Sequence, residues 1–172
     1  MTPFGKRPSD KASPARTGSP VRAVPPLRTI SPLRTVTRVL LGGALLFAGT
    51  SHLTFARQEF TAQVPAWLPL NADFVVLASG VVEIGLGAAL VFLPRQRVPV
   101  GWATAAFFVA IFPGNIAQYA DGVSAFGLDS DRARLIRLFF QPVLVLWALW
   151  STGAWRDRRS LVDGLRSRRG KP

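Results

Sequence analysis

Four long apolar segments dominate the pattern of hydrophobic and polar positions along the chain. Each extends over roughly 20 residues, the length at which an α-helix crosses about 30 Å of hydrocarbon. None shows the strict alternation of a strand in a membrane barrel, and each is about twice as long as such a strand. The pattern therefore predicts an all-α fold, an integral membrane four-helix bundle with transmembrane helices over residues 36–55, 74–93, 98–119 and 135–155.

The composition separates apolar and charged residues in the same way. Apolar residues make up 49% of the 172 positions, yet the formal net charge is +12. The charges gather between and outside the apolar segments, which is the segregation that a lipid solvent selects. We therefore expect a multi-pass protein in the lipid bilayer of the cell membrane.

Lysine and arginine lie mainly on one side of the predicted spans. Eight occur up to Arg38, two are Arg95 and Arg97 between the second and third spans, and seven occur from Arg156 onward. The opposite side has four arginines with several acidic residues beside them. Because basic residues that flank spans stay in the cytoplasm, both termini are predicted to be cytoplasmic.

The segments outside the bundle are basic and, at the N-terminal end, rich in Pro, Ser and Thr. We expect a disordered basic tail over residues 1–35, a transmembrane domain over 36–155 and a basic cytoplasmic tail over 156–172. Insertion topology and attraction to anionic lipid head groups explain this charge, and no nucleic-acid recognition motif is present. We therefore expect no nucleic-acid partner.

The residue types present exclude several kinds of chemistry. The chain has no cysteine, which excludes thiolate nucleophiles, disulfide exchange and iron–sulfur clusters as chemistry of the chain itself. It has a single histidine, so no metal site is expected within one protomer, although a homo-oligomer could share ligands. No catalytic residue can be assigned, and the sequence does not decide whether the chain is an enzyme.

The polar residues inside the predicted spans are the candidate ligand-pocket residues, because each one costs free energy in hydrocarbon. Helix geometry places all of them in the outer half of the membrane, with one of them, the carboxyl group of Glu83, near its middle. We expect a polar pocket that opens outward, in which an outer cation reaches toward that carboxyl group. The five candidates are His52, Glu83, Asn115, Arg137 and Gln141.

Structural roles compete with this interpretation. Hydrogen bonds between helices are common in membrane bundles, and we expect Asn115 and Gln141 to act in that way. The run 112–115 contains Pro113 and is expected to break the hydrogen-bond ladder of the third helix. The apolar segment 57–70 is predicted to lie on the outer interface, as a membrane anchor or as a lid over the pocket.

Several spaced motifs resemble the DoxX-like family of small four-span membrane proteins, over about 36–150. The histidine-containing end of the first span, with the loop after it, is similar to that family, as are the Gly/Glu stretch of the second span and shorter motifs in the third and fourth. One departure is that Leu53 stands near the histidine where the family often has a proline. The motifs are 49–52 with Phe60 and 64–69, then 79–87, 112–116, and 137–141 with Trp147.

The resemblance implies a membrane protein that works with a membrane or membrane-associated protein partner. Some relatives are subunits of quinone-linked oxidoreductases or partners of oxidative-stress enzymes. Three functions remain open for this chain: a redox-associated subunit with a quinone in the outer pocket, an assembly factor or scaffold for other membrane proteins, and a small proton-coupled transporter. In the first, Glu83 handles a proton and His52 or Arg137 binds a carbonyl group of the quinone.

Overall fold

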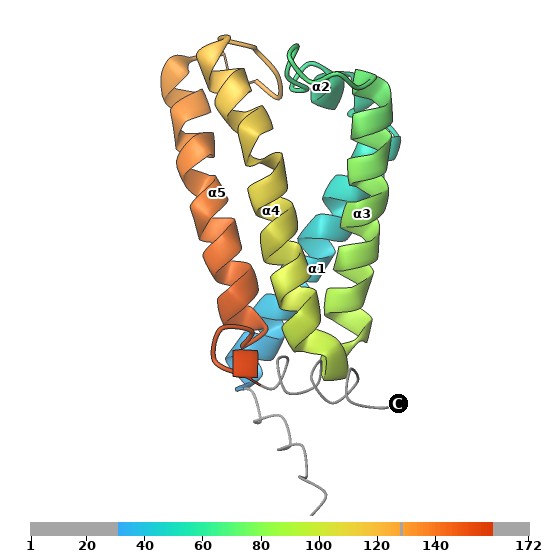
Figure 1. Ribbon diagram of the computed structural model, residues 1–172, viewed down its shortest axis with the longest axis vertical. Helices are drawn as coiled ribbons and strands as arrows, with labels where there is room; N and C mark the ends of the chain where they lie inside the picture. Colours follow the sequence, from blue (N-terminus) through green and yellow to red (C-terminus); the bar gives the residue numbers. More distant parts are fainter. Residues whose placement is uncertain (1–30, 128, 160–172) are drawn as a thin grey trace, which may run out of the picture.

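The structure is a computed structural model that describes residues 31–127 and 129–159 (Figure 1). Most of the two predicted tails, 1–30 and 160–172, lies outside the described residues. Within the described ranges the chain is helical and has no strand. The elements are α1 (Pro32–Leu53), α2 (Arg57–Thr61), α3 (Ala72–Phe92), the 3₁₀ turn η1 (Pro94–Gln96), α4 (Arg97–Ala120) and α5 (Asp131–Ser151).

The prediction of four long helices is confirmed. Four helices of the described chain are long and apolar enough to cross a membrane: α1, α3, α4 together with η1, and α5. Polar side chains cap the first turns of α1, α3 and α5. Ser31, Asn71 and Ser130 each accept a hydrogen bond from a backbone N–H in the first turn that follows. Gly122 and Gly153 follow α4 and α5 in left-handed conformations, at φ of 64° and 67°.

Two predicted boundaries differ from the structure. Helix α1 begins at Pro32, inside the segment 1–35 that we assigned to a disordered tail, because proline at the first helical position and the cap by Ser31 favour a start there. Asp157 belongs to the predicted C-terminal tail but is buried, with 8% of its surface exposed. The ordered domain therefore extends beyond both predicted edges.

The helices pack as two pairs, α1 with α3 and α4 with α5 (Figure 1). Glycines allow the backbones of α1 and α3 to approach closely. A Cβ atom on Gly49 would lie 2.6 Å from the carbonyl oxygen of Gly80, and one on Gly87 would lie 2.7 Å from that of Gly42. Small residues have this effect at membrane helix interfaces generally.

The two pairs meet at the end of the bundle where α1 begins and α5 ends (Figure 1). The buried core lies between all four long helices and includes Leu41, Leu90 and Ala148. Arg38 donates to the Leu90 carbonyl, and the indole N–H of Trp147 on α5 donates to the Thr37 carbonyl of α1 at 3.1 Å. We call this region the closed end.

A buried ion pair holds the residues after α5 at the closed end. Arg97 donates to Asp157 and to the Thr152 carbonyl, both at 2.9 Å. Burial tends to raise the pKa of Asp157, but hydrogen bonds from Arg97 and Arg156 outweigh that effect, so its pKa lies below the ordinary value. Asp157 is therefore ionised at neutral pH and ties this segment to the start of α4.

Gly49→Ala tests the close approach of α1 and α3. We expect a lower apparent melting temperature in detergent, because the new methyl group meets the Gly80 backbone, and overpacking typically costs about 1–3 kcal/mol. Gly43→Ala on the same helix is the control, since nothing lies within 4 Å of its Cβ position. Equal melting temperatures for the two variants would contradict the described packing.

Candidate functional site

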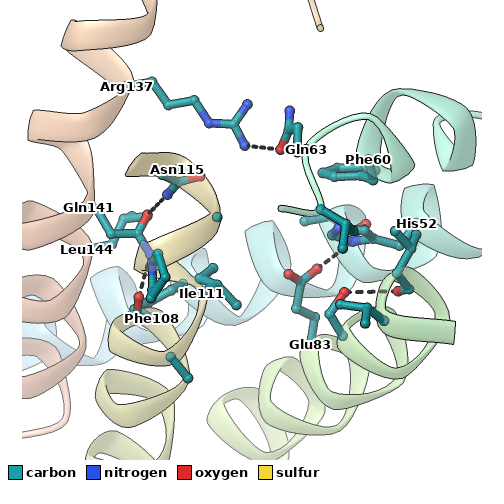
Figure 2. A pocket seen from close by; sticks show the side chains of 18 of the residues that line it. His52, Phe60, Gln63, Glu83, Phe108, Ile111, Asn115, Arg137, Gln141 and Leu144 are labelled. Carbon is teal, nitrogen blue, oxygen red and sulfur yellow. Dashed lines mark hydrogen bonds and ion pairs between the residues drawn. The ribbon is translucent and has the colours of Figure 1, made fainter. Parts of the chain in front are cut away.

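One pocket of about 490 Å³ lies between the two helix pairs, toward the end opposite the closed end (Figure 2). All five residues that the sequence singled out line it. Most of its wall is apolar, from α1, α3, α4, α5 and the segment after α2. Its polar lining residues are His52, Gln63, Ser79, Glu83, Asn115, Arg137 and Gln141.

His52 and Glu83 form the polar part of the wall on the α1–α3 side. The Nδ1 atom of His52 lies 2.9 Å from the Ala48 carbonyl oxygen and 2.9 Å from Glu83 Oε2. A carbonyl oxygen can only accept, so Nδ1 carries a hydrogen that it donates to Ala48, and Glu83 Oε2 lies beside this N–H group without a hydrogen bond of ordinary geometry. Both side chains are buried, at 7% and 5% exposed for the whole residue. This Nδ1–H is the ion-pair contact of the carboxylate.

The close approach of α1 and α3 positions this pair. A Cβ atom on Gly80 would lie 2.9 Å from the Cβ of His52, and one on Gly49 would lie 3.0 Å from the Cβ of Glu83. Glycine at each position therefore lets the polar residue of the other helix sit against the backbone. The ring of Phe60 stacks on the imidazole of His52, with the ring centroids 3.4 Å apart.

Asn115 and Gln141 form a hydrogen-bonded group on the α4–α5 side. Gln141 Nε2 donates to the Phe108 carbonyl at 2.6 Å, which directs its Oε1 to the Nδ2 of Asn115 at 2.9 Å. This group joins α4 to α5, as expected for interhelical hydrogen bonds. Helix α4 continues through Pro113 to Ala120, so the run 112–115 lies within the helix.

Of the two side chains that could reach Glu83, His52 contacts it and Arg137 does not. Its guanidinium donates to Gln63 Oε1 at 2.7 Å and lies 5.7 Å from the centroid of the Phe126 ring. Figure 2 shows Arg137 and Gln63 together, apart from the His52–Glu83 pair. Among the described residues, the ion-pair contact of the Glu83 carboxyl group is with His52, and Arg137 pairs with Gln63 instead.

The segment 57–70 covers part of the pocket, with Phe60, Gln63 and Trp67 among its lining residues. The α4–α5 loop meets it: the backbone N–H of Phe126 donates to Glu59 Oε2 at 2.8 Å, and the Phe60 and Phe126 rings are 4.5 Å apart. Phe126 holds a left-handed conformation at φ 56° in this position. We call residues 59–63 with Phe126 the roof.

Arg57 fixes the start of the roof to the first turn of α3. Its Nε donates to Asp73 Oδ1 at 2.5 Å, and this hydrogen bond raises the pKa of the Arg57 guanidinium. The sequence pattern gave the segment 57–70 as an anchor or a lid, but it did not single out Gln63 or Phe126. These two residues lie in loops, where no helical periodicity relates them to the spans, and their long-range hydrogen bonds with Arg137 and Glu59 place them.

The site does not have the composition of a metal centre. No group of three or more His, Cys, Asp or Glu residues that could hold a metal ion occurs among the described residues. The arrangement instead places one carboxylate–imidazole pair and one guanidinium at different parts of an otherwise apolar cavity. Such a cavity can hold a small organic molecule by burial and orient it by hydrogen bonds.

Fold and pocket together define a small helical protein with four potential membrane spans and a polar cavity between two helix pairs. A family model described as a domain of unknown function, DUF8561, matches residues 41–152. The chain therefore belongs to the DUF8561 family. No curated protein and no solved structure matches the chain. The resemblance to DoxX-like proteins stays a prediction.

Two substitutions at His52 test the described ion pair. His52→Leu removes the imidazole N–H group 2.9 Å from the buried Glu83 carboxyl group, and we expect a loss of about 1–3 kcal/mol in stability, because the carboxyl group then has only apolar neighbours on that side. His52→Asn keeps an N–H near the Nδ1 position and should retain much of that stability. The measurement is unfolding in detergent at neutral pH, and equal losses in both variants would contradict the Nδ1 assignment.

Proposed function

We propose that this protein is a multi-pass protein of the cell membrane, with both termini in the cytoplasm, whose pocket binds the head group of a membrane quinone. In this proposal it is a redox-associated subunit that acts with a partner enzyme. The observation that carries the proposal is the 490 Å³ pocket, in which a buried His52–Glu83 pair faces an apolar cavity.

Apolar side chains on the outer surface of the four long helices support membrane insertion. Phe47, Phe92, Phe139 and Leu146 each have about two thirds or more of their surface exposed, at 69%, 72%, 70% and 66%. Exposed apolar area on this scale is stable in lipid and unfavourable in water. The basic residues near the closed end support a cytoplasmic location for that end.

The pocket has the size and composition expected of a small-molecule site. Known sites occupy about 300–1,000 Å³ and combine an apolar wall with a few placed polar groups. A quinone head group is a flat ring with polar oxygens at opposite edges, which fits a cavity with apolar walls such as Phe108 and Ile111 and polar groups on different sides. In the proposed orientation the pocket lies in the outer half of the membrane, within reach of lipid-soluble molecules.

The partner enzyme supplies the electrons in this proposal. The chain contains no cysteine, so no thiol of its own takes part in electron transfer. Glu83 then acts as the proton-handling group of the site, and His52 keeps its carboxylate oriented. These roles remain proposals for the protein as part of a larger assembly.

The scaffold and transporter alternatives receive less support from the packing. Four glycines that could dock another membrane protein, Gly42, Gly49, Gly80 and Gly87, are already covered in the α1–α3 interface. A transporter needs a path to both sides of the membrane, whereas the closed end is densely packed around Leu41, Leu90 and Ala148.

Filling the pocket tests quinone binding. We expect lipid extraction and native mass spectrometry to find quinone with the wild-type protein and to find it depleted in Ala44→Trp, because Ala44 lines the pocket and an indole ring would occupy it. Ala106→Trp is the matched control, since Ala106 is exposed on α4 and is not among the pocket's lining residues.

Two results would contradict the proposal. One is the absence of quinone from the wild-type protein. The other is equal quinone content in the wild type and both variants. If other membrane proteins co-purify equally with all three forms and no quinone is found, the scaffold function takes the place of the redox function.

A further inference from the structure

One of the two oxygens of the Glu83 carboxylate contacts a polar group of the described residues. Figure 2 shows one of its oxygens turned to His52 and the other turned toward the inside of the pocket. Its ion-pair contact within residues 31–127 and 129–159 is the one with His52, and that contact uses Oε2. No hydrogen bond of ordinary geometry reaches the carboxylate from the described residues. The second oxygen therefore offers free lone pairs to whatever occupies the cavity.

The His52 contact fixes the hydrogen-bonding character of this group. The Nδ1 atom of His52 donates its hydrogen to the Ala48 carbonyl and lies 2.9 Å from Glu83 Oε2, so Oε2 faces an N–H group. A carboxylate accepts hydrogen bonds and cannot donate them. The α1–α3 side of the pocket is thus an acceptor wall.

The side of the cavity that Arg137 lines has the opposite hydrogen-bonding character. Arg137 has five N–H donors and no acceptor, and the one hydrogen bond that the structure gives it is the one to Gln63. Its remaining N–H groups are donors for a ligand atom that accepts. Figure 2 places Arg137 and Glu83 on different sides of the cavity.

We propose that the pocket selects the reduced hydroquinone form of its ligand over the oxidised quinone. This inference follows from the opposite hydrogen-bonding character of the two sides of the cavity, and it rests on the proposed function. Both forms carry an oxygen that accepts a hydrogen bond from Arg137. Only the hydroquinone has an O–H that donates to the free oxygen of Glu83. The carbonyl oxygen of a quinone would instead meet a carboxylate, and two acceptors facing each other in an apolar cavity repel.

The test compares the two redox forms of one probe, decylubiquinone and its hydroquinone, by isothermal titration calorimetry under argon with the purified full-length protein. We expect the wild type to bind the hydroquinone at least about tenfold more tightly, since hydrogen bonds to charged groups are among the stronger ones in proteins. In Glu83→Gln the preference should fall to near unity or reverse, because the amide N–H₂ can donate to a quinone carbonyl.

Asp129→Asn is the matched control. It makes the same change from carboxylate to amide at an exposed position outside the pocket, and the preference for the hydroquinone should stay as in the wild type. Equal affinity of the wild type for both forms would overturn the inference and leave quinone binding intact. An unchanged preference in Glu83→Gln would also overturn it, because Glu83 would then not determine which redox form binds.

The wild-type titration separates this inference from the proposed function and does not depend on how any variant folds. If the wild type binds neither form, the proposed function fails, and the inference fails with it. If it binds the quinone more tightly, quinone binding stands and the acceptor wall is wrong.

Discussion

The close contact of α1 with α3 is the constraint on which the site depends. Glycine at 49 and 80 removes the side chains that would separate the two backbones, and His52 and Glu83 then face each other across the interface at 2.9 Å. A carboxyl group in a membrane span needs a partner, because an isolated charge is costly in hydrocarbon. The helix contact supplies that partner without bringing a second charge from the other helix pair.

The rest of the architecture follows from the way the two helix pairs meet. They pack tightly at the closed end, where the core, the buried Arg97–Asp157 pair and the Trp147 hydrogen bond join α1, α4 and α5. Among the described residues, the buried core does not extend to the other end, where the pocket lies between the two helix pairs. The roof connects the pairs again through Phe126 and the Arg137–Gln63 hydrogen bond. The pocket is therefore a consequence of packing that is complete at one end only.

Much of this could be predicted from the sequence, and the limits have physical causes. Span length and the isolated polar residues gave the four helices and all five candidate pocket residues, because both signals are local. The distinction between the partners of Glu83 could not be predicted, since His52 and Arg137 lie at similar depth and only the helix pairing separates them. The segment 57–70 was expected as an anchor or a lid, but the contacts of Gln63 and Phe126 could not be predicted, because both residues lie in loops, where the sequence carries no periodicity that indicates a neighbour.

The proposed function depends most directly on a water-accessible pocket that opens on the side of the membrane opposite the termini. Because the chain has no cysteine, a single introduced cysteine reports directly on the accessibility of its position. Cysteine at the pocket-lining Ser79 should react with a small membrane-impermeant thiosulfonate added to the outside of right-side-out vesicles, whereas cysteine at the outward-facing Val82 should stay unreactive in lipid. Reaction of the Ser79 variant only from the cytoplasmic side, or equal reactivity of both variants, would contradict the account.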